Sequence, residues 1–262
     1  MKTIVITGST RGIGLEMAKA FLRAGCQVTL SGRGEALNEM AKAQLEGFEN
    51  RYTYISCDVQ NKESIAKLWE DSKQKWGNID IWINNAGQNA PHAFAWETPS
   101  FETSNIIHTN IIGMIYGSQI AAKGMIDQGF GAIYSMEGLG SNDMIQVKTI
   151  LYGTTKRALT YFMKGLSKEL EGTGVIAGRL SPGMMLTDFI TKSPDGSPSK
   201  VVEEERFKRI FNILADRPET VAAFFIPRML SNTKNDVQIA WLTNQKVMWR
   251  FMTSPFLKRK LL

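Results

Sequence analysis

The 262-residue sequence contains few of the residues that build disulfide frameworks and metal centres, with only two cysteines and two histidines. Cys26 and Cys57 lie at or within predicted strands and lack the spacing of metal ligands, so we expect reduced core residues and no metal site. The sequence also contains no run of eighteen apolar residues, and its first strand begins at Met1 without a basic signal region. These absences predict a cytoplasmic protein.

Acidic residues are absent after Asp236, within a protein of formal net charge +6. Basic and aromatic residues alternate there: Lys246, Arg250, Lys258, Arg259 and Lys260 with Trp241, Trp249, Phe251 and Phe256. Such a tail can lie peripherally on an anionic membrane surface, or it can pack as a helix on its own domain or on a second subunit. Nucleic-acid binding is not expected, because the basic residues are few and form no recognition motif.

No linker divides the chain, and its composition of 43% hydrophobic and 21% charged residues is typical of a globular protein. We expect a single α/β domain with a C-terminal helical extension. Residues 1–190 would form the dinucleotide-binding and catalytic core, and residues 191–235 a substrate lid and helices. Residues 236–262 would form the basic aromatic tail.

A glycine-rich turn follows the first apolar stretch, Met1–Ile6, which is typical of a buried parallel strand. From Ile13 onward, apolar residues recur at helical spacing. The glycines admit a pyrophosphate to the N-terminus of this helix, where free N–H groups and the positive end of the helix dipole lie. We expect this turn to contact a dinucleotide through Gly8, Thr10, Arg11, Gly12, Ile13 and Gly14.

Further strands and helices alternate along the chain, which predicts a Rossmann-type, doubly wound parallel sheet with helices on both faces. The expected strands are 1–6, 26–31, 52–57, 79–83, 131–136 and 174–180, and the later helices are 35–46, 61–76, 101–124 and 152–171. Small, polar or amide residues follow several strands, where a cofactor would bind: Asp58, Val59, Asn85, Ala86, Gly87, Pro182, Gly183 and Thr187. Asp58 could accept a hydrogen bond from adenine, or could cap the helix 61–76.

The residues after the second strand favour NADPH over NADH. An acidic residue would bind the ribose 2′-hydroxyl of NADH, but this sequence has Gly32 there. Arg33 is adjacent, and Arg11 lies in the glycine turn. Their guanidinium groups suit a 2′-phosphate. Alternatively, both arginines are only solvated.

Three polar residues suggest acid–base chemistry. Tyr152 and Lys156 share one face of a helix, where an ammonium lowers the pKa of a neighbouring phenol. The alternative is that this spacing, which is common, has no function. Asn110 lies among isoleucines and needs hydrogen-bond partners, so its role is structural, catalytic or both.

Taken together, these motifs resemble those of the short-chain dehydrogenases/reductases, in order and spacing, across residues 1–190. The resemblance implies that Tyr152 protonates a carbonyl oxygen and that Lys156 lowers the tyrosine pKa and holds the nicotinamide ribose. It also implies that Asn110 holds a water in a proton relay and that Thr187 contacts the carboxamide. Family members usually form dimers or tetramers, through helices that here lie near 105–124 and 152–171.

The serine that the family places before the tyrosine is missing, because Leu139 or Gly138 stands there. The segment 135–141, Ser-Met-Glu-Gly-Leu-Gly-Ser, resembles the chlorophyll b reductase branch, as do stretches at 152–156, 181–188 and 211–222. Because the chain starts directly at its first strand, without a transit peptide, it looks like a bacterial homologue of that branch. Ser141 is the candidate replacement, with Ser135 behind it, unless neither touches the substrate.

The resemblance implies an NADPH-dependent reductase that converts a formyl group on a hydrophobic tetrapyrrole to hydroxymethyl. The alternatives are a reductase of another hydrophobic aldehyde or ketone, such as a steroid or an acyl chain, and a non-catalytic NADPH-binding sensor. Residues 191–205 are rich in Pro, Ser and Gly and follow the Pro-Gly motif, so we expect a mobile lid over the substrate. The alternative is an ordinary surface loop.

Overall fold

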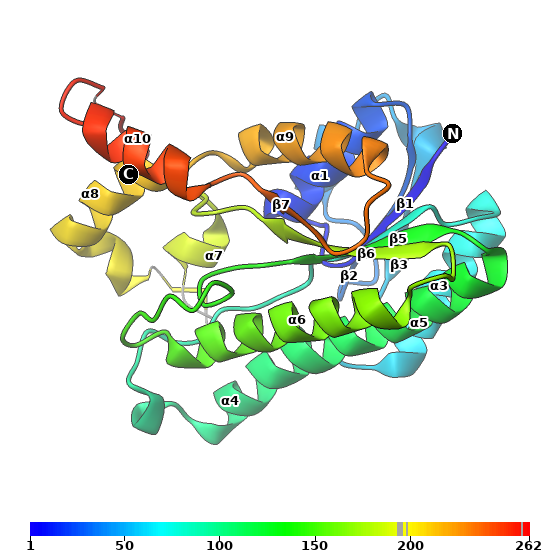
Figure 1. The fold of residues 1–262 in the computed structure, drawn as a ribbon, viewed down its shortest axis with the longest axis horizontal. Helices are drawn as coiled ribbons and strands as arrows, with labels where there is room; N and C mark the ends of the chain where they lie inside the picture. The colour runs from blue at the N-terminus through cyan, green and yellow to red at the C-terminus, as the bar shows by residue number, and fades with distance from the viewer. Residues whose placement is uncertain (193–195, 198, 258) are drawn as a thin grey trace.

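A single parallel β-sheet forms the centre of the protein, which we describe from a computed structural model covering residues 1–192, 196–197, 199–257 and 259–262 (Figure 1). Within this part of the chain the sheet has seven strands, in the order β3-β2-β1-β4-β5-β6-β7. The strands are β1 Thr3–Ile6, β2 Gln27–Gly32, β3 Tyr52–Ser56, β4 Ile81–Asn84, β5 Gly131–Met136, β6 Val175–Ser181 and β7 Val237–Ala240. This is the doubly wound sheet that the sequence predicts.

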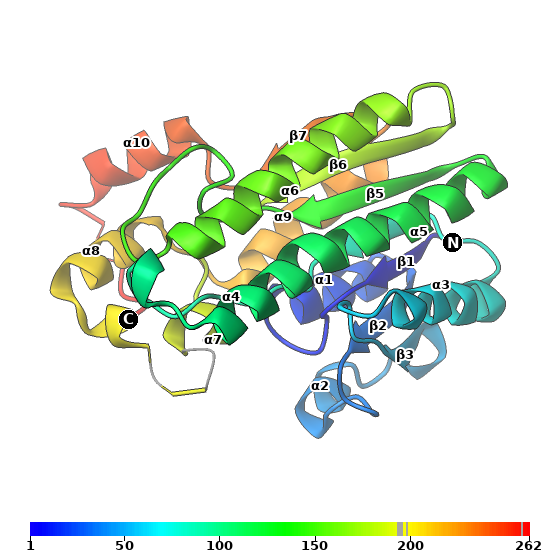
Figure 2. The ribbon, with the colours of Figure 1, turned by 90° about the horizontal axis from the view of Figure 1, so that it is seen from below.

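Helices cover both faces of the sheet, as Figures 1 and 2 show. One face carries α1 and α9, which pack against each other, and the other carries α3, α5 and α6. Each face has its own apolar core, because the strands bury side chains on both sides. The helices are α1 Gly12–Arg23, α2 Glu39–Gln44, α3 Lys62–Trp76, α4 Ser100–Ile107, α5 Gly113–Gln128, α6 Ile150–Glu169, α7 Asp188–Thr191, α8 Glu205–Leu214, α9 Pro218–Ser231 and α10 Asn244–Thr253.

Three elements differ from the sequence prediction. The seventh strand, β7, was not predicted and lies inside the segment assigned to the basic tail. The helix expected over 101–124 is divided into α4 and α5 by a π-helical turn at His108–Ile112. The helix expected over 35–46 is reduced to α2, which begins where Asn38 caps it by accepting a hydrogen bond from the Ala41 N–H.

The C-terminal extension folds back onto α8 through one buried carboxylate (Figure 1). Asp216 is 7% exposed and forms ion pairs of 2.7 Å with both Arg250 and Arg259. It also accepts a hydrogen bond of 2.6 Å from the Trp241 indole. Lys246 lies over the Trp241 ring. These basic side chains therefore turn toward the protein, as expected for a tail packed on its own domain.

The aromatic residues of the same segment point outward. Trp249, Phe251 and Phe256 are 53%, 45% and 86% exposed. Among the residues that the structure describes, no helix combines the length and apolar character that crossing a bilayer requires. Lys258 of the predicted tail lies outside the described residues.

Replacing Asp216 by alanine should release this extension. The change leaves Arg250, only 9% exposed, without its carboxylate, and breaking a buried pair in this way costs about 3–5 kcal/mol. We expect faster amide exchange in α10 and a lower thermal midpoint. Glu205→Ala, which removes an exposed pair with Lys208, is the control and should change neither. Unchanged exchange in α10 of the Asp216 variant would contradict this account.

Candidate active site

The glycine turn after β1 is fixed by the residues that follow β4. Gly8 has a φ of +62°, and a Cβ there would lie 2.8 Å from the Cα of Ala86. The Asn85 side-chain amide donates to the carbonyls of Thr7 and Gly8 at 3.0 and 2.9 Å. Only glycine combines this conformation with this close approach. The strand ends β1 and β4 are thus joined at the edge where a cofactor would bind.

The N-terminus of α1 opens onto this turn. Its N-cap residue, Arg11, makes no side-chain capping hydrogen bond, so this cap leaves the first N–H groups of the helix available. Gly12 has a φ of +57°, and a Cβ there would meet only the methyl group of Thr187, at 3.9 Å. Thr187 follows β6, so the first and sixth strands bring their motifs together here. Free N–H groups above side-chain-free backbone fit a pyrophosphate.

The expected ribose subsite has no acidic residue and no space for one. A Cβ at Gly32 would lie 2.7 Å from the Cγ2 of Thr10. The Tyr54 hydroxyl lies 2.6 Å from the Gly34 carbonyl and 3.0 Å from the Gly32 carbonyl, and it would contact a side chain at Gly32 from the other side. Arg33 and Arg11 are both exposed, and among the described residues Arg11 forms an ion pair of 4.0 Å with the half-exposed carboxylate of Asp188.

The residues that follow β3 and β6 make local contacts with neighbouring elements. The Asp58 carboxylate accepts a hydrogen bond of 3.0 Å from the Gln60 N–H, while Asn61 caps α3. The suggestion that Asp58 caps this helix was therefore wrong. Val59 is buried against Gly113. After β6, Pro182 is buried and Gly183, at a φ of +71°, packs against Leu242.

Asn110 lies in the π-helical turn between α4 and α5, and it is 1% exposed. Its side-chain oxygen accepts from the Gln88 N–H at 2.8 Å. Its amide donates to the Gln88 carbonyl at 3.0 Å and to the Thr155 hydroxyl at 3.1 Å. Asn110 therefore connects the loop after β4 to α6. These contacts are the hydrogen-bond partners that a buried amide needs. A Cβ at Gly87 would lie 3.4 Å from its oxygen.

Tyr152 and Lys156 lie on the inner face of α6 and are 9% and 5% exposed. The Lys156 amine donates to the Met136 carbonyl at 2.9 Å and lies 5.7 Å from the centre of the Tyr152 ring. Burial lowers the pKa of Lys156 to about 8, and the charge of Glu137 opposes this shift. Burial raises the pKa of Tyr152. The expected lowering of the tyrosine pKa is therefore not observed: burial raises this pKa, and the Lys156 amine donates to a backbone carbonyl and not to the phenol.

The two hydroxyls that could replace the missing serine are buried, and both are hydrogen-bonded to other groups. Ser141 accepts from the Gly138 N–H at 3.2 Å and lies 3.3 Å from the Lys156 carbonyl. Ser135 is fully buried between Asn84 and Met163. Gly138 itself has no space for a side chain, because a Cβ there would overlap the Tyr152 hydroxyl.

An apolar wall, not recognised in the sequence, covers Tyr152. The ring of Phe189 on α7 lies 5.4 Å from that of Tyr152, and Asn89 donates to the Phe189 carbonyl at 3.2 Å. Leu139 packs into the same cluster.

Of the expected lid, residues 193–195 and 198 lie outside the described residues, while Lys200–Glu203 form a 3₁₀ turn. Gln88, Thr155, Phe189 and Glu137 were missed as site residues because nothing local in the sequence marks their distant partners.

The comparisons with known proteins agree with this geometry. The family model described as short chain dehydrogenase matches residues 2–197. The probable chlorophyll(ide) b reductase NYC1 of Oryza sativa subsp. japonica is 31% identical over 271 residues, covering 97% of this chain and 52% of the relative. The chlorophyll(ide) b reductase NOL of Arabidopsis thaliana is 33% identical over 256 residues, covering 93% of this chain and 70% of the relative. The chain thus spans about half the length of the first of these.

Solved structures show the same fold at lower identity. A 3-ketoacyl-(acyl-carrier-protein) reductase from Brucella melitensis, complexed with NADH, has a TM-score of 0.78 at 19% identity, covering 92% of this chain and 96% of that one. The protein ElxO with NADP bound has a TM-score of 0.78 at 23% identity, covering 91% and 96%. Fold, motif geometry and sequence agree, and the chain belongs to the short-chain dehydrogenase/reductase family of NAD(P)-dependent oxidoreductases.

Proposed function

We propose that this oxidoreductase uses NADPH to reduce a formyl or keto group on a hydrophobic substrate. A formyl group on a tetrapyrrole, converted to hydroxymethyl, is the first candidate. The observation that carries the proposal is the position of Tyr152. Its phenol lies between the buried Lys156 amine and an apolar wall, at the strand edge that also carries the dinucleotide cradle.

When bound, NADPH supplies a hydride to the carbonyl carbon. The Tyr152 hydroxyl would donate its proton to the carbonyl oxygen, which completes the alcohol. The Lys156 ammonium favours the phenolate that remains, because an opposite charge stabilises it. Asn110 would hold the water of a proton relay, as in the family that the chain resembles, and Thr187 would contact the carboxamide. The wall around Phe189 excludes bulk water from the proton transfer.

A large apolar substrate is supported by the surface near this wall. The segments 94–101 and 138–150 meet where Lys148 lies over the Phe94 ring. They expose an unusual number of large apolar side chains: Trp96, Phe101, Met144, Ile145, Val147 and Ile150. The two plant relatives are named as reductases of chlorophyll(ide) b, and these names point to the same class of substrate.

Two surfaces carry further proposals. The exposed apolar side of α10, with Trp249 and Phe251, is where a peripheral membrane contact would form, although Arg250 turns inward. A homodimer or homotetramer would use α5 and α6, as members of the family that the chain resembles usually do.

Tyr152→Phe should abolish turnover and leave NADPH affinity nearly unchanged, because only the proton donor is lost. We expect kcat to fall by about 10²–10⁴-fold, measured by the loss of NADPH absorbance with chlorophyll b or its phytol-free derivative. Tyr161→Phe on the exposed side of α6 is the control and should be as active as the wild type. A fully active Tyr152 variant would refute the mechanism. If the protein reduces only other hydrophobic aldehydes, those aldehydes become the proposed substrates. If it binds NADPH but reduces none of them, the alternative of a non-catalytic NADPH-binding sensor is favoured.

Arg33→Ala should weaken NADPH binding by about 10–100-fold and leave NADH binding unchanged, since it removes a charge-assisted bond to the 2′-phosphate. The measurement is quenching of tryptophan fluorescence by each nucleotide. Arg23→Ala, an exposed arginine at the far end of α1, is the matched control and should bind both as the wild type does. Equal affinity of the wild type for NADPH and NADH would contradict the cofactor assignment.

Gly8→Ala should abolish binding of either nucleotide, because the new Cβ meets Ala86 and displaces the turn. Gly47→Ala provides a control for backbone strain alone. Gly47 has a φ of +84°, but no atom lies within 4 Å of the Cβ position. Both variants should lose stability by roughly 1 kcal/mol from the positive φ, but only Gly8→Ala should lose nucleotide binding. Normal binding by the Gly8 variant would rule out this cradle.

A further inference from the structure

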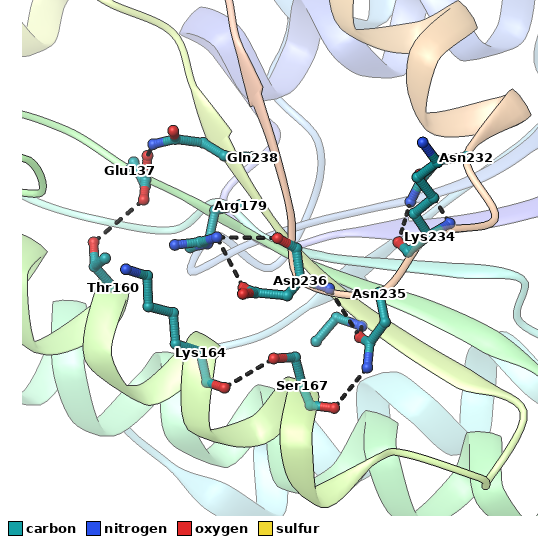
Figure 3. A network of polar contacts seen from close by, with 11 residues as sticks. Glu137, Thr160, Lys164, Ser167, Arg179, Asn232, Lys234, Asn235, Asp236 and Gln238 are labelled. Atoms are coloured by element: carbon teal, nitrogen blue, oxygen red, sulfur yellow. Dashed lines mark hydrogen bonds and ion pairs between the residues drawn. The ribbon is translucent and has the colours of Figure 1, made fainter.

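A carboxylate is buried next to the catalytic lysine and has no part in the mechanism above. Glu137 directly follows β5 and is 2% exposed. Its two oxygens are held from different elements, by the Gln238 amide of β7 at 2.6 Å and by the Thr160 hydroxyl of α6 at 3.3 Å (Figure 3). Burying a carboxylate is costly unless charge and hydrogen bonds compensate for it. Its surroundings therefore have to supply that compensation.

The cations near Glu137 come from two elements. Arg179 of β6 lies on the same face of the sheet, but its guanidinium donates to the Asp236 carboxylate at 2.8 Å and to the Asp236 carbonyl at 3.1 Å (Figure 3). Among the described residues, no ion pair within 4.0 Å joins Glu137 to a cation. On α6, Lys164 is exposed at the surface, whereas Lys156 is buried. The charge of Glu137 favours the ammonium form of this buried Lys156.

The backbone connects this carboxylate directly to the lysine. The Met136 carbonyl, in the peptide that leads into Glu137, accepts the hydrogen bond from the Lys156 amine. The Glu137 N–H of the same peptide donates to the Leu180 carbonyl of β6 at 2.8 Å. The Thr160 hydroxyl lies within hydrogen-bond distance of both the Glu137 carboxylate and the Lys156 carbonyl. One peptide and one turn of α6 therefore position both charges.

We propose that Glu137 is a positioning residue of the active site, whose buried carboxylate keeps the Lys156 ammonium charged and in place beside Tyr152. Gln238 and Thr160 hold the carboxylate in that position. The proposal relies on the proposed reductase function only for its kinetic test, because the charge on Lys156 can be observed without turnover.

The sign of the effect follows from the charges that face Lys156. Burial favours the neutral amine, and Glu137 favours the ammonium; Tyr152, on the same helix, stays neutral because burial raises its pKa. Removing the charge of Glu137 therefore lowers the pKa of Lys156 further, and the ammonium is lost at a lower pH. Reduction by the wild type would fail on the alkaline side as the ammonium is lost, so the variant would fail earlier.

The test is a pH titration of the cofactor-free protein, labelled with ¹³C-lysine and followed by NMR. Lys156→Met identifies the resonance of Lys156 by its disappearance. Glu137→Gln keeps the shape of the side chain and removes its charge, so its Lys156 midpoint should lie lower than that of the wild type by about one pH unit. Glu137→Asp keeps the charge and should restore most of the midpoint. An unchanged midpoint in Glu137→Gln overturns the proposal.

Should Glu137→Gln not fold, Glu137→Met carries the same test, because it removes the charge and leaves the exposed Gln238 amide free to bond to water. Its Lys156 midpoint should also fall by about one pH unit, and an unchanged midpoint overturns the proposal. In the kinetic test, the alkaline limb of kcat/KM for NADPH oxidation should shift to lower pH in Glu137→Gln. A shifted midpoint in a protein without any reductase activity would refute the proposed function and leave the role of Glu137 intact.

Discussion

The burial of the Lys156 ammonium is the constraint on which the rest of the active site depends. Tyr152 and Lys156 lie on the same face of α6, which faces the sheet. Burying the phenol therefore also buries the charged amine. An ammonium at that depth needs an acceptor and a nearby negative charge. The end of β5 supplies both, through the Met136 carbonyl and the Glu137 carboxylate.

The seventh strand contributes to this arrangement. Glu137 is held in place by Leu180 of β6 and by Gln238 of β7, whose positions follow from the parallel register of the two strands. The strand thereby contributes to a site that lies at the end of β5. The C-terminal extension depends on β7 in turn, because Trp241 follows the strand and binds Asp216.

Much of the core could be predicted from the sequence, because its signals are local. The six predicted strands are apolar runs, and parallel strands place their carboxyl ends at one edge, which brought Gly8, Asn85 and Thr187 together. The strand β7 was missed because it has only four residues at the edge of the sheet, where one face stays partly exposed. The π-helical turn at Asn110 was missed for a different reason. Its buried amide bonds to Gln88 and Thr155, and such tertiary bonds leave no trace in helical periodicity.

Pairings between distant polar residues account for most of what the sequence did not reveal. Glu137 and Gln238 lie 101 positions apart, and Asp216 and Arg259 lie 43 positions apart. From composition, Arg259 belongs to a basic segment that could lie at the surface. In the structure it forms an ion pair with the buried carboxylate of Asp216. Charge counts show how many cations a segment has, but they do not show which of them solvent or a membrane can reach.

The missing serine follows from the same packing. The Tyr152 hydroxyl occupies the space that a side chain at Gly138 would need, and the hydroxyl of Ser141 is turned toward backbone. Under the proposed function, the phenol is therefore the hydroxyl that polarises the carbonyl, and the remaining contacts come from the apolar wall of Leu139 and Phe189. A formyl group is more electrophilic and less crowded than a ketone, so it depends less on a second donor. Under the same proposal, loss of the serine would favour an aldehyde on a large apolar body, which the wall would bind through buried area and not through directed hydrogen bonds.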